Sequence, residues 1–288
     1  GTFYMQTSGS LASGTFASMV NLPAAGPTAV TAAHMLIGNS ANGPASSTSS
    51  VGLGLTNTIN TGTITIGAYR GNGIVSFQPD VTGGSLTLRG VSGGSSRVDN
   101  VYVGYKGGGD NFGKGILDVS TGSIDARVTN FIVGRYVVYA STNQTGTFSM
   151  TSGTLDATAV TLGSVNVATG SVGNPAIAAT VNQGGGVVKA ASLTFGVNAG
   201  VSGLNNLPTF TSTYNLTSGT LAAGIVASGA GTSGSTSLRS INWTGGTITT
   251  YDTSTDLTMT GVSGSGGAIV VAVSGGDTKT FDVPAGRT

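Results

Sequence analysis

The sequence predicts an all-β protein that folds as a single parallel β-helix (β-solenoid) with about 30 residues per turn. Three observations predict this fold. Two short phrases recur along the chain, apolar and polar residues alternate inside them, and glycine and small polar residues separate them. Side chains of a strand alternate between its two faces, whereas those of a helix repeat about every 3.6 residues. Each phrase therefore predicts a short strand with one buried face, and about three such strands fit into one repeat.

The first phrase consists of an apolar residue, two small residues, a glycine, a serine or threonine and a second apolar residue. Its glycine permits a tight or left-handed backbone, and its Ser and Thr neighbours can bond local amides, so it predicts a turn between apolar positions. The copies begin at Ile59, Val81, Val119, Met150, Leu216 and Trp243, and their central glycines are Gly62, Gly84, Gly122, Gly153, Gly219 and Gly246. We expect these six glycines to occupy equivalent positions of the repeat.

The second phrase is an apolar residue, any residue, another apolar residue and a glycine. It closes at Gly38, Gly67, Gly104, Gly134, Gly163 and Gly196, so successive closing glycines differ by 29, 37, 30, 29 and 33 positions. The two apolar residues of each copy are expected to point inward and the residue between them outward. Predicted core residues are therefore Val101, Val103, Phe131 and Val133, together with Trp243 of the first phrase.

Composition favours one domain over residues 1–288. Hydrophobic residues make up 38% of the chain, enough for a continuous core, which argues against disorder despite the 50 glycines. Charged residues make up only 7%, and 11 basic residues nearly balance 10 acidic ones, so no nucleic-acid partner is expected. Cysteine is absent and histidine occurs once, so neither a metal nor another cofactor is expected. No apolar run approaches the roughly 18 residues of a membrane helix, so we expect no membrane insertion.

Isolated polar residues are interpreted as structural. His34 shares a repeat column with Asn100 and Asn130, at the start of a strand, and lacks the partners of a metal or catalytic site. Stacked Asn100 and Asn130 would form a side-chain amide ladder. The sequence GGGD at 107–110 is similar to part of a calcium-binding nonapeptide but occurs once, whereas such a site needs tandem copies.

Three segments carry a resemblance to a known family. GTFSMTSGTLDATAVTLG (146–163), KGILDVSTGSIDARVTNFIVG (114–134) and TYNLTSGTLAAG (213–224) are similar to the repeats of bacterial surface-exported β-solenoid proteins with autotransporter-associated β-strand repeats, such as autotransporter passengers. The resemblance extends over nearly the whole chain. It implies a right-handed β-helix, secretion, and roles in adhesion, biofilm or surface layers, and it brings no catalytic residues. The chain departs from the family pattern in its irregular turn lengths.

A polysaccharide-degrading β-helix enzyme is the third hypothesis for function, because such enzymes gather carboxylates and basic residues on one face. The chain offers two groups of this kind, namely Asp118 and Asp125 near Arg127, and Asp99 and Asp110 near Lys106. The other interpretation is that single aspartates cap turns and lone basic residues hydrate the surface. The scarcity of charge favours this second interpretation, and we predict that the protein is not an enzyme.

Four tyrosines fall at or just after the closing glycines of two successive turns. They are Tyr102, Tyr105, Tyr136 and Tyr139, and with Ile132 they would form an aromatic ridge if the turns stack in register. One interpretation is that RYVVYAS (135–141) is an extra strand packed on the rod. The other is an interface, either a lateral contact with another subunit or a contact with a glycan.

These observations predict a secreted, extracellular structural protein of the bacterial cell surface that self-assembles into filaments or a surface or biofilm matrix. Both TFYMQTSGSL (2–11) and IVVAVSGGDTKTFDV (269–283) carry the alternation of the repeats, so neither terminus has the sequence of a polar cap. We expect residues near 1–20 and 265–288 to contact an adjoining chain or domain, either more of the same polypeptide or another copy docked head to tail, and we expect lateral packing as well. An adhesin that binds carbohydrate or a host surface is the second hypothesis. The start at Gly1 and the interrupted strand phrase at the C-terminus predict a mature or excised segment of a longer exported protein.

Overall fold

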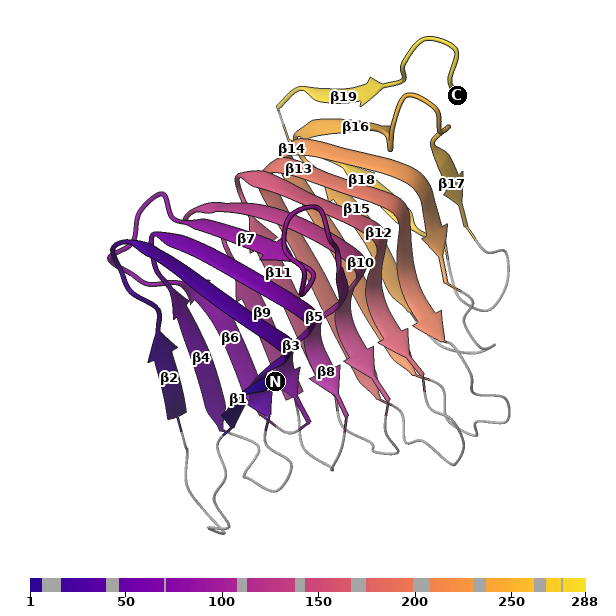
Figure 1. The fold of residues 1–288 in the computed structure, drawn as a ribbon. Coiled ribbons are helices and arrows are strands. Elements are labelled where there is room, and N and C mark those ends of the chain that lie inside the picture. The colour runs from indigo at the N-terminus through magenta and orange to yellow at the C-terminus, as the bar shows by residue number, and fades with distance from the viewer. Residues whose placement is uncertain are drawn as a thin grey trace.

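The computed structural model describes residues 1–6, 17–39, 47–69, 71–107, 113–137, 143–166, 175–198, 208–229, 237–261, 268–275 and 277–288. Within these ranges the chain contains strands and turns but no helix. The strands pair in parallel with strands of the neighbouring turns and form a β-solenoid whose turns lie roughly 31 residues apart (Figure 1). The predicted fold class, an all-β parallel β-helix, is confirmed.

Each turn contributes strand segments to three faces, as the spacing of the phrases predicts. Face A consists of β2 (Ala17–Asn21), β4 (Thr48–Leu53), β6 (Asn72–Phe77), β9 (Gly113–Asp118), β11 (Gln144–Met150), the first parts of β13 (Ala176–Asn198) and β14 (Thr209–Ser228), β15 (Leu238–Trp243) and β18 (Val270–Val273). Face B consists of the first parts of β3 (Pro27–Asn39), β5 (Thr56–Ala68), β10 (Ser123–Tyr136) and β12 (Gly153–Val165), the middle of β13 and β14, and β7 (Ser85–Arg89), β16 (Gly246–Thr250) and β19 (Lys279–Asp282). Face C consists of β1 (Thr2–Gln6), β8 (Val98–Lys106), β17 (Thr258–Thr260) and the last parts of β3, β5, β10, β12, β13 and β14.

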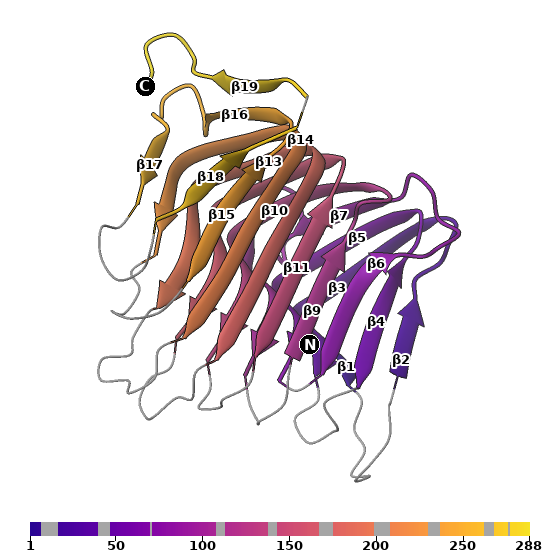
Figure 2. The ribbon, with the colours of Figure 1, turned by 180° about the vertical axis from the view of Figure 1, so that it is seen from behind.

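The coil is right-handed. In Figure 1, strands of face C descend on the near side as the turns advance from the indigo end to the yellow end. Figure 2 shows the opposite side, where the strands of face A ascend. For an observer at the N-terminal end the chain therefore turns clockwise as it moves away, which is the hand that the resemblance implies.

Three inward columns of side chains run the whole length of the rod, one from each face. The face A column begins at Val20 and ends at Val271, the face B column runs from Val30 to Phe281, and the face C column runs from Phe3 to Met259. The residues predicted for the core lie in these columns or in the inward columns beside them, and all are buried, with Trp243 only 3% exposed and the other four at 0%, namely Val101, Val103, Phe131 and Val133. Burying one such side chain contributes roughly 1.5–3 kcal/mol, so these columns account for much of the stability of the rod.

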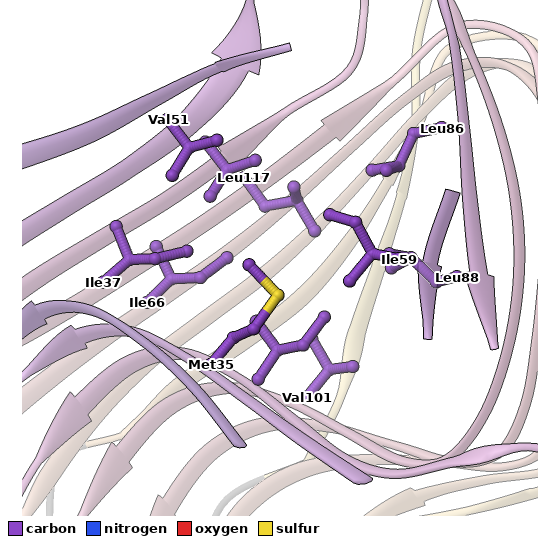
Figure 3. A pocket seen from close by; sticks show the side chains of 11 residues that line it. Met35, Ile37, Val51, Ile59, Ile66, Leu86, Leu88, Val101 and Leu117 are labelled. Atoms are coloured by element: carbon purple, nitrogen blue, oxygen red, sulfur yellow. The ribbon is translucent and has the colours of Figure 1, made fainter. Parts of the chain in front are cut away.

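A small void lies in the N-terminal half of the core. Figure 3 shows Met35 and Val101 of face C, Val51 and Leu117 of face A and Leu86 of face B pointing toward it. Its volume is about 10 Å³, and every residue that lines it is apolar. Such a space admits at most about one water molecule and offers it no hydrogen-bond partner, so it is a dry packing gap rather than a binding site.

The closing glycines of the second phrase lie where face C meets face A. All six have a positive φ, between 64° and 80°. A Cβ on Gly67 would lie 2.1 Å from the carbonyl oxygen of Lys114, and one on Gly104 would lie 2.3 Å from that of Thr145. From the opposite face, a Cβ on Gly115 would lie 2.0 Å from the backbone nitrogen of Gly104. The two backbones are in contact here, so glycine is needed both for its conformation and for its lack of a side chain.

The first phrase does not form a single column. Gly84, Gly122, Gly153, Gly219 and Gly246 lie where face A meets face B, but Gly62 lies inside β5, where face B meets face C. Thr56 pairs with Ser85, so Leu55 occupies the position that Gly84 has in the next turn. The prediction of six equivalent glycines is therefore wrong for Gly62. Both corners need a tight turn between inward apolar residues, and the same short phrase satisfies either.

The longest interval between closing glycines results from a loop at 90–97, between β7 and β8 at the corner of faces B and C. Its last residue, Arg97, donates hydrogen bonds to the carbonyl oxygens of Val128, at 2.9 Å, and Asp156, at 2.8 Å. The same guanidinium binds both carboxylate oxygens of Asp156 at 2.9 Å. Val128 and Asp156 belong to the next two turns, so Arg97 ties three turns together.

Candidate functional site

The C-terminal end of the solenoid is open. Among the described residues, β17, β18 and β19 pair on one side only, with β14, β15 and β16. Phe281 is 55% exposed although its neighbour in the column, Ile248, is fully buried. Val271 is 37% exposed beside the buried Ile241. Phe281 packs edge-on against Trp243, the single tryptophan of the sequence, with ring centroids 4.7 Å apart, and its own side chain remains largely exposed.

The N-terminal end is open in the same way. Within the described ranges, β1, β2 and residues 27–32 of β3 pair on one side only, with β3, β4 and β5. Val20 is 37% exposed beside the buried Val51. Phe3, Leu22 and Val30 are only partly buried against the core. Both ends therefore present the apolar interior together with strand edges, which are templates for another strand.

Charged side chains are distributed unevenly between the two ends. Arg70 is the first Asp, Glu, Lys or Arg in the sequence, so the N-terminal turns carry none of these residues. At the other end the ammonium group of Lys279 donates to the carbonyl oxygens of Gly275 and Asp277, at 3.1 and 2.8 Å. Edge strands of soluble proteins usually carry charges that prevent pairing with another chain. The N-terminal end lacks that protection, whereas the C-terminal edge strand β19 carries Lys279 and Asp282.

A second candidate surface lies on face C, on the side of the rod. The rings of Tyr102 and Tyr105 in β8 have centroids 5.2 Å apart, and the guanidinium carbon of Arg135 in β10 lies 4.7 Å from the first centroid and 5.9 Å from the second. Ile132 is the register partner of Tyr102 on the next turn. All four side chains are partly exposed. We call this group the tyrosine–arginine patch. Burial raises the pKa of Tyr105 and Arg135 opposes that rise, so the Tyr105 phenol is neutral at pH 7.

Tyr136 does not belong to this surface. Its side chain is fully buried, which contradicts its place in the predicted aromatic ridge. Gly134 adds an extra inward position and reverses the alternation, so that Arg135 points outward and Tyr136 inward. Tyr139 lies outside the described residues, as does most of the 135–141 segment that was interpreted as an extra strand, and only Arg135 and Tyr136 of it belong to β10. The members of the predicted interface that are partly exposed are Tyr102, Tyr105 and Ile132.

The aspartates considered for catalysis do not come together. Asp118 ends β9 on face A, where its carboxylate accepts hydrogen bonds from the amide and hydroxyl of Ser120 at 3.0 and 2.6 Å. Asp125 lies on face B and binds Arg89 at 2.5 Å. The contacts of Asp118 are the turn capping that the second interpretation predicts, whereas the pairing of Asp125 with Arg89 was not predicted.

The other predicted group is also separated. Lys106 is fully buried, whereas Asp99 is exposed at the start of the same strand. Asp110 and most of the GGGD sequence lie outside the described residues. In the part of the chain that the structure describes, no three His, Asp or similar ligands are placed to hold a metal ion.

Two asparagine ladders connect successive turns. The predicted one is present, since the amide nitrogen of Asn130 donates to the amide oxygen of Asn100 at 3.2 Å. The sequence reasoning missed a second ladder on face A, in which Asn242 donates to Asn215 and Asn215 donates to Asn182, each at 2.8 Å. The shared repeat column of Asn215 and Asn242 was the available signal, but an extra residue in the phrase after Asn182 obscured its third member.

A polar groove of about 420 Å³ lies beside this ladder, where face A meets face B. Gly184 forms its floor between Thr151 and Thr217. Both threonine hydroxyls are already used, because they donate to the carbonyl oxygens of Ser120, at 2.5 Å, and Gln183, at 3.3 Å. The groove therefore offers a ligand few free donors, and we consider it a weaker candidate than the ends or the patch.

No family model, curated protein or solved structure matches the chain. The described residues include no apolar helix of membrane-spanning length. The class of protein is thus defined by the fold alone, as a parallel β-solenoid. Its two notable surfaces are its open ends and the tyrosine–arginine patch.

Proposed function

We propose that this protein is an extracellular structural protein of the bacterial cell surface, which self-assembles into filaments or a surface or biofilm matrix by stacking its turns end to end. The observation that carries the proposal is the exposure of the three core columns at both ends of the rod. An interior turn of a solenoid is hydrogen-bonded and packed on both sides, whereas an end turn lacks half of these contacts. A second copy docked on the end would supply them, as would a further turn of the same polypeptide.

The two ends match in the kind and order of their strands. The C-terminal end offers β17 on face C, β18 on face A and β19 on face B, and the N-terminal end offers β1, β2 and the start of β3 on the same three faces. A copy docked head to tail would therefore set like face on like face and continue the right-handed coil. Such a contact does not close on itself, so it propagates into a filament.

The three core columns indicate which side chains would meet when one copy docks on another. Val271 would face Val20 on face A, and Phe281 would face Val30 on face B, because each pair belongs to one column. The third pair, on face C, is Met259 with Phe3. Secretion and the bacterial surface are proposed on the resemblance of the repeats, and the low charge of the chain would permit lateral packing of filaments as well.

Phe281→Asp tests the proposal. A carboxylate in an apolar column would be buried without a partner by the docked copy, so we expect at least a tenfold loss of assembly. Val91→Asp is the matched control, because Val91 is 49% exposed but lies on the side of the rod, in the 90–97 loop. Sedimentation velocity and electron microscopy of the purified 288-residue chain should show rods that lengthen with concentration for the parent and the control only. A parent protein that stays monomeric at every concentration contradicts the proposal.

An adhesin that binds carbohydrate is the second candidate function. The tyrosine–arginine patch favours it, because the patch places two partly exposed aromatic rings beside a cation on the outward side of face C. The two functions are compatible, since the patch lies on the side of the rod and leaves the ends free.

A further inference from the structure

We propose that the tyrosine–arginine patch binds an acidic saccharide, with a sugar ring stacked on the tyrosines and a uronic-acid carboxylate bound by Arg135. The proposal is independent of end-to-end assembly, because no residue of the patch belongs to a terminal turn.

The apolar part of the patch departs from its surroundings. Tyr102 lies in an outward column of face C whose other members include Thr65, Thr161 and Thr194. Within this column Tyr102 and its register partner Ile132 are large apolar side chains that remain partly exposed. The rings of Tyr102 and Tyr105 are tilted by 39° to each other, so together they form a shallow apolar surface. The C–H groups on one side of a pyranose ring can pack on such a surface.

The charged part of the patch is the guanidinium of Arg135, which forms no ion pair with the described residues. The described arginines Arg89 and Arg97 each pair with an aspartate, but among the described residues no carboxylate pairs with Arg135. Its Nε atom is buried and has no hydrogen-bond partner in the described part of the chain. Cation–π contacts with Tyr102 and Tyr105 hold the group in place. A planar guanidinium fixed in this way is suited to bind a carboxylate through two parallel hydrogen bonds.

The chemistry of the ligand follows from both parts together. A neutral sugar would cover the rings but leave the guanidinium unpaired, and an inorganic anion would pair with the guanidinium but leave the rings uncovered. A sugar that carries a carboxylate satisfies both. Since the Tyr105 phenol is neutral at pH 7, it adds no negative charge that would repel such a ligand.

The test uses trigalacturonic acid and its fully methyl-esterified form, which has the same sugar rings without the charge. Isothermal titration calorimetry should show saturable binding of the acid and at least tenfold weaker binding of the ester. Arg135→Gln should weaken binding of the acid about tenfold or more, and Tyr102→Ala should weaken it several-fold. Arg135→Lys keeps the charge but loses the planar fork, so it should recover only part of the affinity. Arg127→Gln is the matched control, because Arg127 is exposed on face B, away from the patch.

The result that overturns the proposal is no binding of the acid, equal binding of acid and ester, or an equal loss of binding in Arg127→Gln. If no saccharide binds and Arg135→Gln instead changes the sedimentation of the protein alone, the patch is a contact between copies and the proposal is wrong. Circular dichroism establishes whether each variant is folded. If a variant does not fold, the proposal is tested by Arg135→Lys and by comparing the binding of the acid with that of the ester.

Discussion

At the scale of single residues, glycine determines how closely the faces of the solenoid approach. The position on face A that faces the closing glycines changes along the rod, from the N-terminal to the C-terminal turns, in the order Gly73, Gly115, Gly146, Ala179, Ser212 and Arg239. The backbone contact seen at Gly115 is thus replaced by side chains of increasing size. At the end of the series Arg239 is buried and donates from Nε to the carbonyl oxygen of Phe195 at 2.9 Å. Burial lowers the pKa of this arginine.

Gly115→Ala should therefore destabilise the fold more than an ordinary surface glycine substitution. The added Cβ would lie 2.0 Å from the Gly104 nitrogen and 2.3 Å from the Ile66 carbonyl oxygen, and backbone cannot move aside as a side chain can. We expect a loss of roughly 1–3 kcal/mol in the free energy of unfolding, measured by urea denaturation. Gly261→Ala is the control, because its nearest neighbour would be 4.0 Å away. Equal stability of the two variants would show that faces A and C are not in contact.

At the scale of elements, most strands are held by strands of other turns rather than by their neighbours in sequence. The 90–97 loop adds a contact that extends beyond the adjacent turn, because Arg97 reaches Asp156 two turns away. Its carboxylate is less exposed than that of the other ion pair of the described chain, at 23% for Asp156 against 62% for Asp125, although Arg97 at 32% is more exposed than Arg89 at 12%. Substitution of each aspartate therefore allows the contributions of the two ion pairs to stability to be compared directly.

Asp156→Asn should cost about 1–2 kcal/mol in the free energy of unfolding, since it weakens two charge-assisted hydrogen bonds in a partly buried place. Asp125→Asn, which alters the exposed pair, should cost less than about 1 kcal/mol. Thermal or urea denaturation of both variants measures the difference. If Asp125→Asn lowers the free energy of unfolding more than Asp156→Asn does, the contact of Arg97 with Asp156 does not stabilise the fold as the geometry indicates.

At the scale of the whole molecule, the rod has a continuous core whose three columns reach the surface at its ends. The column residues exposed there are apolar, and the N-terminal turns carry no Asp, Glu, Lys or Arg. Association through such ends would depend on burial of apolar surface and on strand pairing rather than on attraction between charges.

Assembly should therefore respond to temperature more than to salt. Raising sodium chloride until the Debye length falls from about 30 Å to about 3 Å should change the extent of assembly by less than about twofold. Warming from the cold should increase it, because hydrophobic association weakens on cooling. Light scattering against salt and temperature measures both. Dissolution of the assemblies by salt would mean that charges hold the copies together.

Structural features that depend only on residues close together in the chain could be predicted from the sequence. Period-two alternation within a phrase was sufficient to predict that Val101 and Val103 are buried and that Tyr102 points outward. The repeat interval was sufficient for a parallel solenoid with three strand segments per turn. These features are local, because the side-chain direction of a strand is fixed by its backbone geometry.

Features that depend on how residues about one turn apart stack on each other could be established only from the three-dimensional structure. The register of the parallel strands places Gly62 at a different corner from the other five glycines. It also places Asn182 beside Asn215 and Arg97 beside Asp156. The left-handed backbone of Gly134, with a φ of 73°, reverses the alternation, so that Tyr136 points into the core and Arg135 outward, and the tyrosine–arginine patch results. Such a reversal changes the face of every later side chain in a strand, and no pattern within a single repeat records where the next turn places its partners.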